Sequence, residues 1–158
     1  MGLEMAVFIT RTRILAVPLE AVREAFLHAP GEWMPTAATT AAADGVETIS
    51  IGALGVSANV DVSLVPQCCD GGKARLAMRW SAHSATALFP VLDADLELAP
   101  SGAEACRLVL TGAYRPPLGP LGRAVDGLLL HHVAEQDIEG FLSAAAAGLE
   151  QQARNHAA

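Results

Sequence analysis

Two adjacent histidines stand in an apolar run near the C-terminal end of the chain. His131 and His132 are followed by Glu135, one helical turn beyond His131. Histidine titrates near pH 6.5, so His131 is a weak candidate for an acid or base, or for a hydrogen bond to a ligand. A core histidine bonded to a backbone carbonyl is the alternative. Metal binding is disfavoured, because neighbouring helical residues diverge by about 100° and helical zinc sites need histidines at i and i+4.

Large adaptable side chains are scarce, since only 4% of the residues are aromatic. Tyr114 is a second weak catalytic candidate, and Arg115 could reach an anionic group or simply lie exposed at a corner. Apolar pockets with a few polar groups are the usual small-molecule sites, although ordinary core packing explains the same residues. The predicted ligand-binding residues are Trp33, Met34, Met78, Trp80, Leu96, Leu110, Tyr114 and His131.

Motifs of common enzymes are missing from the sequence. There is no Gly-x-Ser-x-Gly nucleophile elbow, no Gly-x-Gly-x-x-Gly and no Walker loop. Cys68, Cys69 and Cys106 are odd in number and lack the Cys-x-x-Cys spacing of zinc sites. We therefore predict no metal and no cofactor, and the unpaired thiols favour a reducing, cytoplasmic compartment.

Composition narrows the class of protein further. The chain has 158 residues, 52% hydrophobic and 17% charged, with a net charge of −7. This length predicts one domain over residues 1–158 with a real core. The negative charge disfavours nucleic acid and anionic membranes as partners. No secretory signal is expected at the N-terminus, and no run reaches the ~18 apolar residues of a membrane span.

Apolar periodicity predicts one strand, one helix and then a series of strands. Glu4–Val17 is typical of a strand, and the helix that follows begins at Pro18 and carries Leu19, Val22 and Phe26 on one face. The prolines of "PGEWMP" end that helix. Alternating residues and turn signals predict five further strands: Val46–Ala53, Val56–Val65, Lys73–His83, Val91–Ala99 and Ala105–Ala113.

Simple hairpins between neighbouring strands give a sheet with one apolar and one charged face. On the apolar face these registers pair Ile51 with Val56, Val60 with Trp80, Met78 with Leu96, and Leu96 with Leu108. On the charged face they pair Asp61 with Arg79, Arg79 with Asp95, and Glu97 with Arg107.

A long helix is predicted from about Gly119 or Pro120 to about Gln152. Its apolar stripe reaches back to His131 and is made of Ala134, Ile138, Phe141, Leu142, Ala145 and Leu149. Glu139, Ser143 and Glu150 are expected opposite the stripe. The prolines and glycines of "YRPPLGPLG" predict a corner between the last strand and this helix rather than a phosphate loop.

The order of these elements resembles the SRPBCC superfamily of START-like and birch-pollen-allergen-like proteins, which includes polyketide cyclase and dehydrase families. The resemblance is carried by Val17–Phe26, the strand of Trp80, Leu88–Pro100 and Arg107–Leu142, and is nearest to an uncharacterised bacterial subgroup. It implies an α+β helix-grip fold. A curved antiparallel sheet of about six to seven strands would wrap around the long C-terminal helix, with a short helix after the first strand and an apolar cavity inside.

The same resemblance leaves three functions open. Enzymes of the superfamily place polar residues inside the cavity, whereas the predicted inward positions here are nearly all apolar. We therefore expect binding of a small hydrophobic molecule, lipid or polyketide-like. A cyclase- or dehydratase-like enzyme that uses the same cavity is the first alternative. A ligand-free dimeric interaction module is the second, because the first half of the long helix is apolar nearly all round; the chain would be a monomer or a homodimer.

Overall fold

The computed structural model describes residues 7–34, 46–53, 56–67, 72–82, 91–115 and 127–157. In these ranges six strands form one antiparallel sheet in the order β1-β6-β5-β4-β3-β2. The strands are β1 (Val7–Leu15), β2 (Val46–Ala53), β3 (Val56–Gln67), β4 (Ala74–Ala82), β5 (Val91–Pro100) and β6 (Cys106–Arg115). The helices are α1 (Leu19–His28), α2 (Pro30–Trp33) and α4 (Gly127–Ala157).

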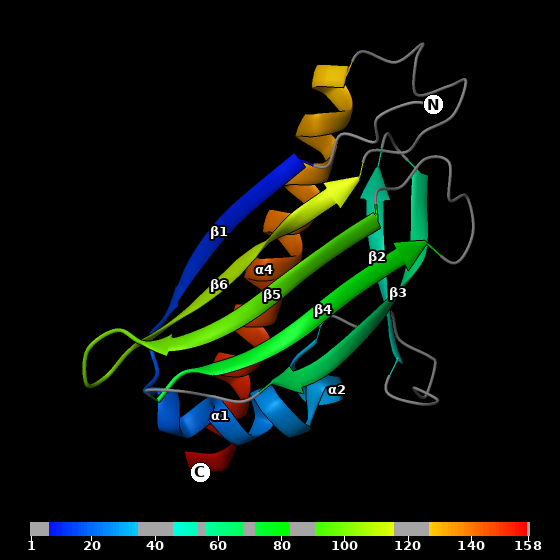
Figure 1. Ribbon diagram of the computed structural model, residues 1–158. Coiled ribbons are helices and arrows are strands. Elements are labelled where there is room, and N and C mark those ends of the chain that lie inside the picture. The colour runs from blue at the N-terminus through cyan, green and yellow to red at the C-terminus, as the bar shows by residue number, and fades with distance from the viewer. Residues whose placement is uncertain are drawn as a thin grey trace.

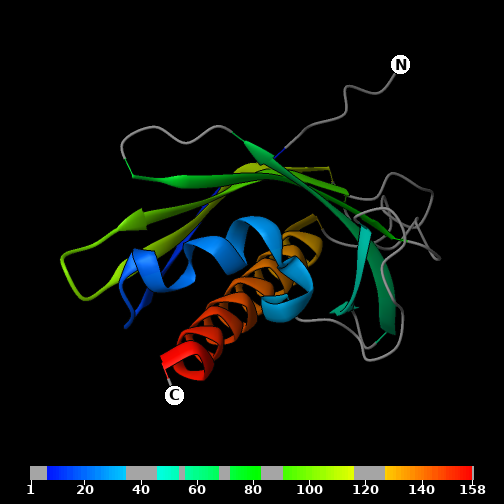
Figure 2. The same cartoon turned by 90° about the horizontal axis from the view of Figure 1, so that it is seen from below.

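The sheet curves around α4, which crosses its concave face (Figures 1 and 2). The short helices α1 and α2 lie beside the C-terminal half of α4 and cover the same end of the sheet (Figure 1). This is the predicted α+β architecture, with a strand count at the lower end of the expected range. The predicted corner spans residues 114–122, and its part from residue 116 on lies outside the described residues; β6 ends at Arg115, directly before Pro116.

The short helix α2 is a feature that the sequence reading missed. The segment expected to end the first helix instead forms a helical turn at Pro30–Trp33, after a break at Ala29. The indole Nε1 of Trp33 donates to the carbonyl oxygen of Ala25 at 2.9 Å, and its ring stacks on Phe26 with centroids 5.5 Å apart. These contacts bring Trp33 into the core, where 1% of it is exposed.

The predicted strand registers were wrong by two residues in every hairpin. Ile51 pairs with Ala58 instead of Val56, and Leu96 pairs with Leu76 and Leu110 instead of Met78 and Leu108. Trp80 likewise pairs with Val62 instead of Val60. A shift of two residues leaves every side chain on its expected face, because the pleat repeats every two residues. The assignment of faces is therefore confirmed for β4, β5 and β6, whose side chains are described, whereas the individual partners are not.

The predicted charge pairs on the outer face were also wrong, because they depended on the same registers. Arg79 lies opposite Ser63 and Asp93 and forms an ion pair with Asp93 at 3.6 Å. Glu97 lies opposite Arg75, not Arg107, and accepts a hydrogen bond from it at 2.9 Å. The outer face is a charged, solvated surface, as predicted, but with different partners.

The long helix α4 ends at Ala157, five residues beyond the predicted end near Gln152. Its predicted apolar stripe is buried wherever the side chains are described, and Ala146 and Ala153 join it. The polar residues expected opposite the stripe instead contact β1 and the segment after it. Ser143 and Glu150 accept hydrogen bonds from Arg13 and from the backbone N–H of Ala16. A sheet that wraps around a helix contacts its flanks as well as its stripe.

Candidate functional site

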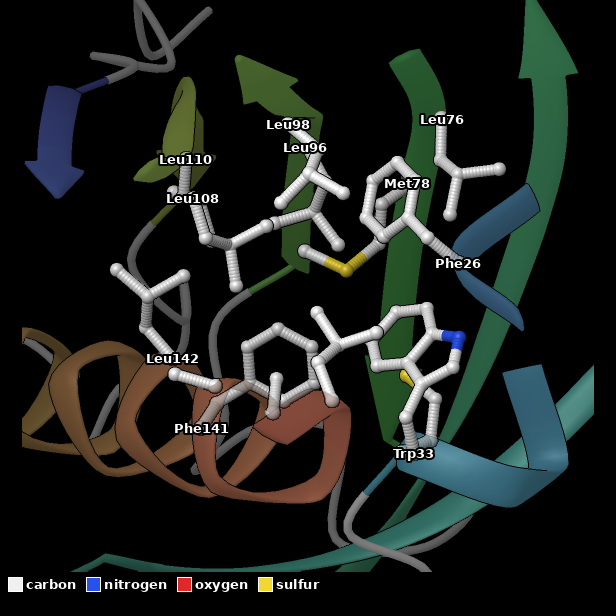
Figure 3. Packing of buried hydrophobic residues seen from close by; sticks show 14 of the residues in the cluster. Phe26, Trp33, Leu76, Met78, Leu96, Leu98, Leu108, Leu110, Phe141 and Leu142 are labelled. Atoms are coloured by element: carbon white, nitrogen blue, oxygen red, sulfur yellow. The ribbon is translucent and has the colours of Figure 1, made fainter. Parts of the chain in front are cut away.

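The candidate site is the apolar interface between the concave face of the sheet and α4. Leu and Met side chains from β4, β5 and β6 point toward Phe141 and Leu142 of α4 (Figure 3). Phe26 of α1 and Trp33 of α2 close the same cluster at one end (Figure 3). No polar or charged residue is among the buried ones in the described part of the chain. The interior therefore offers an apolar surface, which suits an uncharged molecule.

Seven of the eight predicted ligand-binding residues are brought together in this cluster. They share exposed fractions of 5% or less and come from α2 and three neighbouring strands: Trp33, Met34, Met78, Trp80, Leu96, Leu110 and Tyr114. The eighth, His131, belongs to α4, but its side chain lies outside the described structure. A contact between any of them and a ligand stays a prediction.

Trp80, Leu92 and Tyr114 form a row across three strands of the inner face. Trp80 pairs with Leu92, and Leu92 pairs with Tyr114, so the row spans two strand spacings, about 9–10 Å. Trp80 is fully buried and meets Phe141 of α4 at a right angle, with ring centroids 5.6 Å apart. Trp80 and Tyr114 are thus buried aromatic residues with a hydrogen-bonding group in an otherwise apolar wall.

The phenol of Tyr114 lies near two charged groups. Burial raises the pKa of Tyr114, and the negative charge of Glu135 raises that pKa further, whereas Arg11 lowers it. Arg11 also binds Glu135 through its guanidinium, with Nη2 3.0 Å from Oε1. Tyr114 is therefore a protonated hydrogen-bond donor at neutral pH, not a phenolate base.

A row of polar contacts joins β1 to α4, and the sequence analysis did not predict it. Arg11 bonds Glu139 at 3.1 Å and Arg13 bonds Ser143 at 3.0 Å, so two arginines of the edge strand face the helix. Inward-pointing charges on an edge strand also discourage pairing with a second sheet. The alternation of Ile9, Arg11, Arg13 and Leu15 was the available signal, because period two places both arginines on the buried face.

A shallow depression lies on the opposite, outer side of the sheet, lined by residues of β3, β4 and β5. Its charged groups include Arg79 and Asp93, which pair with each other. The depression is open to solvent and does not reach the predicted ligand residues other than Met78. We assign it no function.

Cys106, which lies in the described ranges, takes no part in a recognisable site there. Cys106 is fully buried at the start of β6, where burial, with a smaller contribution from Glu150, raises its pKa to about 11. Cys68 and Cys69 lie outside the described residues. Within the described ranges, no three His, Cys, Asp or Glu side chains gather as a metal site requires. No described helix is both long and apolar enough to cross a membrane.

Solved structures with the same fold include enzymes and other proteins. The Zhui aromatase/cyclase from Streptomyces sp. R1128 superposes with a TM-score of 0.64 at 15% identity, covering 98% of this chain and 97% of that one. A norcoclaurine synthase point mutant from Thalictrum flavum, in complex with a transition-state analogue, gives 0.59 at 13% identity over 100% of both chains.

A START superfamily protein from Mycobacterium smegmatis gives a TM-score of 0.56 at 14% identity, covering 94% of this chain and 97% of that one. No protein-family model and no curated protein matches the sequence. Structural similarity at identities this low establishes the fold and leaves the activity open. The sheet, the helix and these likenesses together show that the chain has a helix-grip fold, which these solved structures share.

Proposed function

We propose that this protein binds a small hydrophobic molecule between the sheet and α4. The observation that carries the proposal is the set of buried residues on the inner face, which is apolar apart from the hydrogen-bonding groups of Trp80 and Tyr114. Apolar surface of this kind drives binding through its removal from water, at about 25 cal/mol per Å². The eight predicted residues, from Trp33 to His131, are the proposed contacts.

The proposed ligand position rests on which interior side chains are held by the protein itself and which carry hydrogen-bonding groups. At the end covered by α1 and α2, Trp33 stacks on Phe26 and bonds Ala25, so its ring is fixed by the protein itself. The row formed by Trp80, Leu92 and Tyr114 lies on the part of the inner face that carries the polar groups. We therefore place the ligand against this row.

Release of a bound compound tests the proposal directly. Protein purified from cells is heat-denatured, and the organic extract is analysed by mass spectrometry, with denatured bovine serum albumin carried through the same purification as control. An apolar compound at a fixed ratio to this protein is the expected result. Its absence, together with failure of the folded protein to bind the neutral probe N-phenyl-1-naphthylamine, would contradict the proposal.

Replacing one of two alanines by leucine, on opposite faces of the sheet, tests where the ligand binds. Ala94 faces the interior with 9% exposed, and Ala77 faces outward on the neighbouring strand. A94L adds volume to the interior, whereas A77L adds the same volume to the outer face. We expect A94L to weaken probe binding at least tenfold and A77L to leave it unchanged, with circular dichroism confirming that both fold.

An enzyme is the second candidate, favoured by the surroundings of Tyr114. A buried phenol with a raised pKa can donate a hydrogen bond or a proton to a carbonyl oxygen in a cyclase- or dehydratase-like reaction. In this proposal Tyr114 is the donor and His131 the acid or base. Turnover of a polyketide-like substrate that is lost in Y114F, while binding is retained, would support it. Equal turnover in Y114F would exclude this role.

Two further expectations stay predictions. Dimerisation through the first half of α4 would give twice the monomer mass by size-exclusion chromatography with light scattering. A monomer at high concentration would exclude the interaction module. A cytoplasmic location is still favoured by the cysteine pattern and would be tested by cell fractionation.

A further inference from the structure

The two tryptophans of this chain differ in how their indole N–H groups are satisfied. Both rings are buried, with 1% of Trp33 and none of Trp80 exposed. Trp33 donates to the carbonyl of Ala25 at 2.9 Å, whereas Nε1 of Trp80 has no hydrogen-bond partner among the described residues. A buried donor without a partner costs about 1–3 kcal/mol, so such groups are rare and mark a missing acceptor.

The partners of Trp80 that the described structure shows on the inner face have no oxygen in their side chains. Leu92 and Val62 are its register partners across β5 and β3, and Phe141 meets its ring from α4. The Phe141 ring could accept the N–H only as a weak π contact.

The charged side chains beside the row, Arg11 and Glu135, lie near Tyr114 and are paired with each other, with Nη2 3.0 Å from Oε1. An ionised ligand group would therefore have to compete with this ion pair for its counter-charge.

We propose that the N–H of Trp80 is the specificity determinant of the interior and donates to an acceptor oxygen on an uncharged ligand. The inference rests on the proposed function and narrows its ligand class. Hydrocarbons would fill the same space but leave the donor unpaired. The ligand class is therefore a flat or compact apolar molecule that carries a ketone, quinone or ester oxygen, and not a fatty acid anion or a pure hydrocarbon.

A comparison of the two tryptophans tests the unpaired donor without any ligand. W33F and W80F remove the same atoms from two buried rings, but only W33F breaks a hydrogen bond in the free protein. We expect W33F to lower the melting temperature clearly more than W80F does. An equal or larger loss in W80F would show that the N–H of Trp80 is already bonded, to Phe141 or elsewhere, and would overturn the inference.

Two rigid probes of nearly equal shape test the ligand class. Fluorenone carries one ketone oxygen and fluorene carries none. We expect the native protein to bind fluorenone roughly fivefold more tightly than fluorene, the ratio that a net hydrogen bond provides, and W80F to bind both equally. In the 15N-labelled native protein, the indole resonance of Trp80 is expected to move downfield with fluorenone only, while that of Trp33 stays in place.

The outcomes separate the inference from the function on which it rests. Equal binding of both probes by the native protein would overturn the role of Trp80 and leave hydrophobic binding intact. A fluorenone preference that persists in W80F would do the same. Binding of neither probe would contradict the proposed function and the inference together.

Discussion

The thiol of Cys106 is enclosed in the core, where ionisation is costly because burial penalises the thiolate. In a variant with Cys68 and Cys69 replaced by alanine, we expect a chromogenic disulfide reagent to react with Cys106 only when urea unfolds the chain. Fast labelling of the folded protein would contradict the burial of this residue.

The same thiol makes stability depend on alkaline pH. The unfolded chain loses the thiol proton near pH 8.5, whereas the folded chain holds it up to about pH 11. The unfolded state therefore binds fewer protons in this window, and the free energy of unfolding falls as pH rises. Urea titrations across the window should show a steeper fall than in Cys106→Ala, which serves as the control.

Glu97 makes the free energy of unfolding depend on pH in the opposite direction, in the acid range. The hydrogen bond from Arg75, together with the charge of Lys73, lowers the pKa of this carboxyl below its ordinary value, although partial burial opposes the shift. A lowered pKa contributes stability at neutral pH that is lost as pH falls through the folded value. E97Q should cost roughly 0.5–1 kcal/mol at pH 7, because the partners are partly exposed, and nothing in strong acid.

A matched control for E97Q is D95N, which changes an exposed carboxylate on the same strand for which the described structure shows no ion pair. Urea midpoints of both variants at several pH values provide the measurement. An E97Q cost that persists unchanged in strong acid would mean that packing, and not charge, is what Glu97 contributes.

At the scale of elements, two glycines of α4 have opposite roles. A Cβ at Gly148 would overlap the carbonyl oxygen of Trp33, so this glycine allows α2 to pack closely on α4. Gly140 is exposed, and a Cβ there would meet nothing. The close approach of α2 fixes Trp33 at one end of the interior.

Alanine at these two positions should therefore change stability in opposite directions. G140A should stabilise the protein by about 0.5–1 kcal/mol, because glycine inside a helix costs that much relative to alanine. G148A should destabilise it by about 1–3 kcal/mol, because the added methyl group overpacks the contact with α2. Denaturant unfolding measures both, and a stabilising G148A would refute the packing role of Gly148.

Element boundaries and faces were largely predictable, but the partners of each strand were not. Alternation assigned the faces of β4 to β6 correctly because burial imposes period two on these strands. Registers depend on turn geometry. The prediction assumed symmetrical hairpins, and this assumption shifted every predicted pair by two residues; the observed partner of Trp80, for example, is Val62. The helix α2 was missed because its four residues begin with a proline and are too few to show a periodic pattern.

At the scale of the whole molecule, one hydrophobic cluster joins α1, α2, the sheet and α4. We propose that residues 1–158 fold as one domain and expect a single cooperative transition in urea. Tryptophan fluorescence, which reports on Trp33 and Trp80, and far-ultraviolet circular dichroism should give the same midpoint. Separate midpoints would indicate that α4 or the outer strands unfold independently.

The sequence alone determined the helix-grip architecture, the apolar inner face and the candidate residues on it, because these follow from periodicity and element order. Tertiary structure decided which polar atoms are satisfied. Trp33 and Trp80 are indistinguishable as buried tryptophans in the sequence, and only packing gives one an acceptor and leaves the other without one. Hydrogen bonds depend on distances of a few ångströms between segments far apart in the chain, which no local pattern encodes.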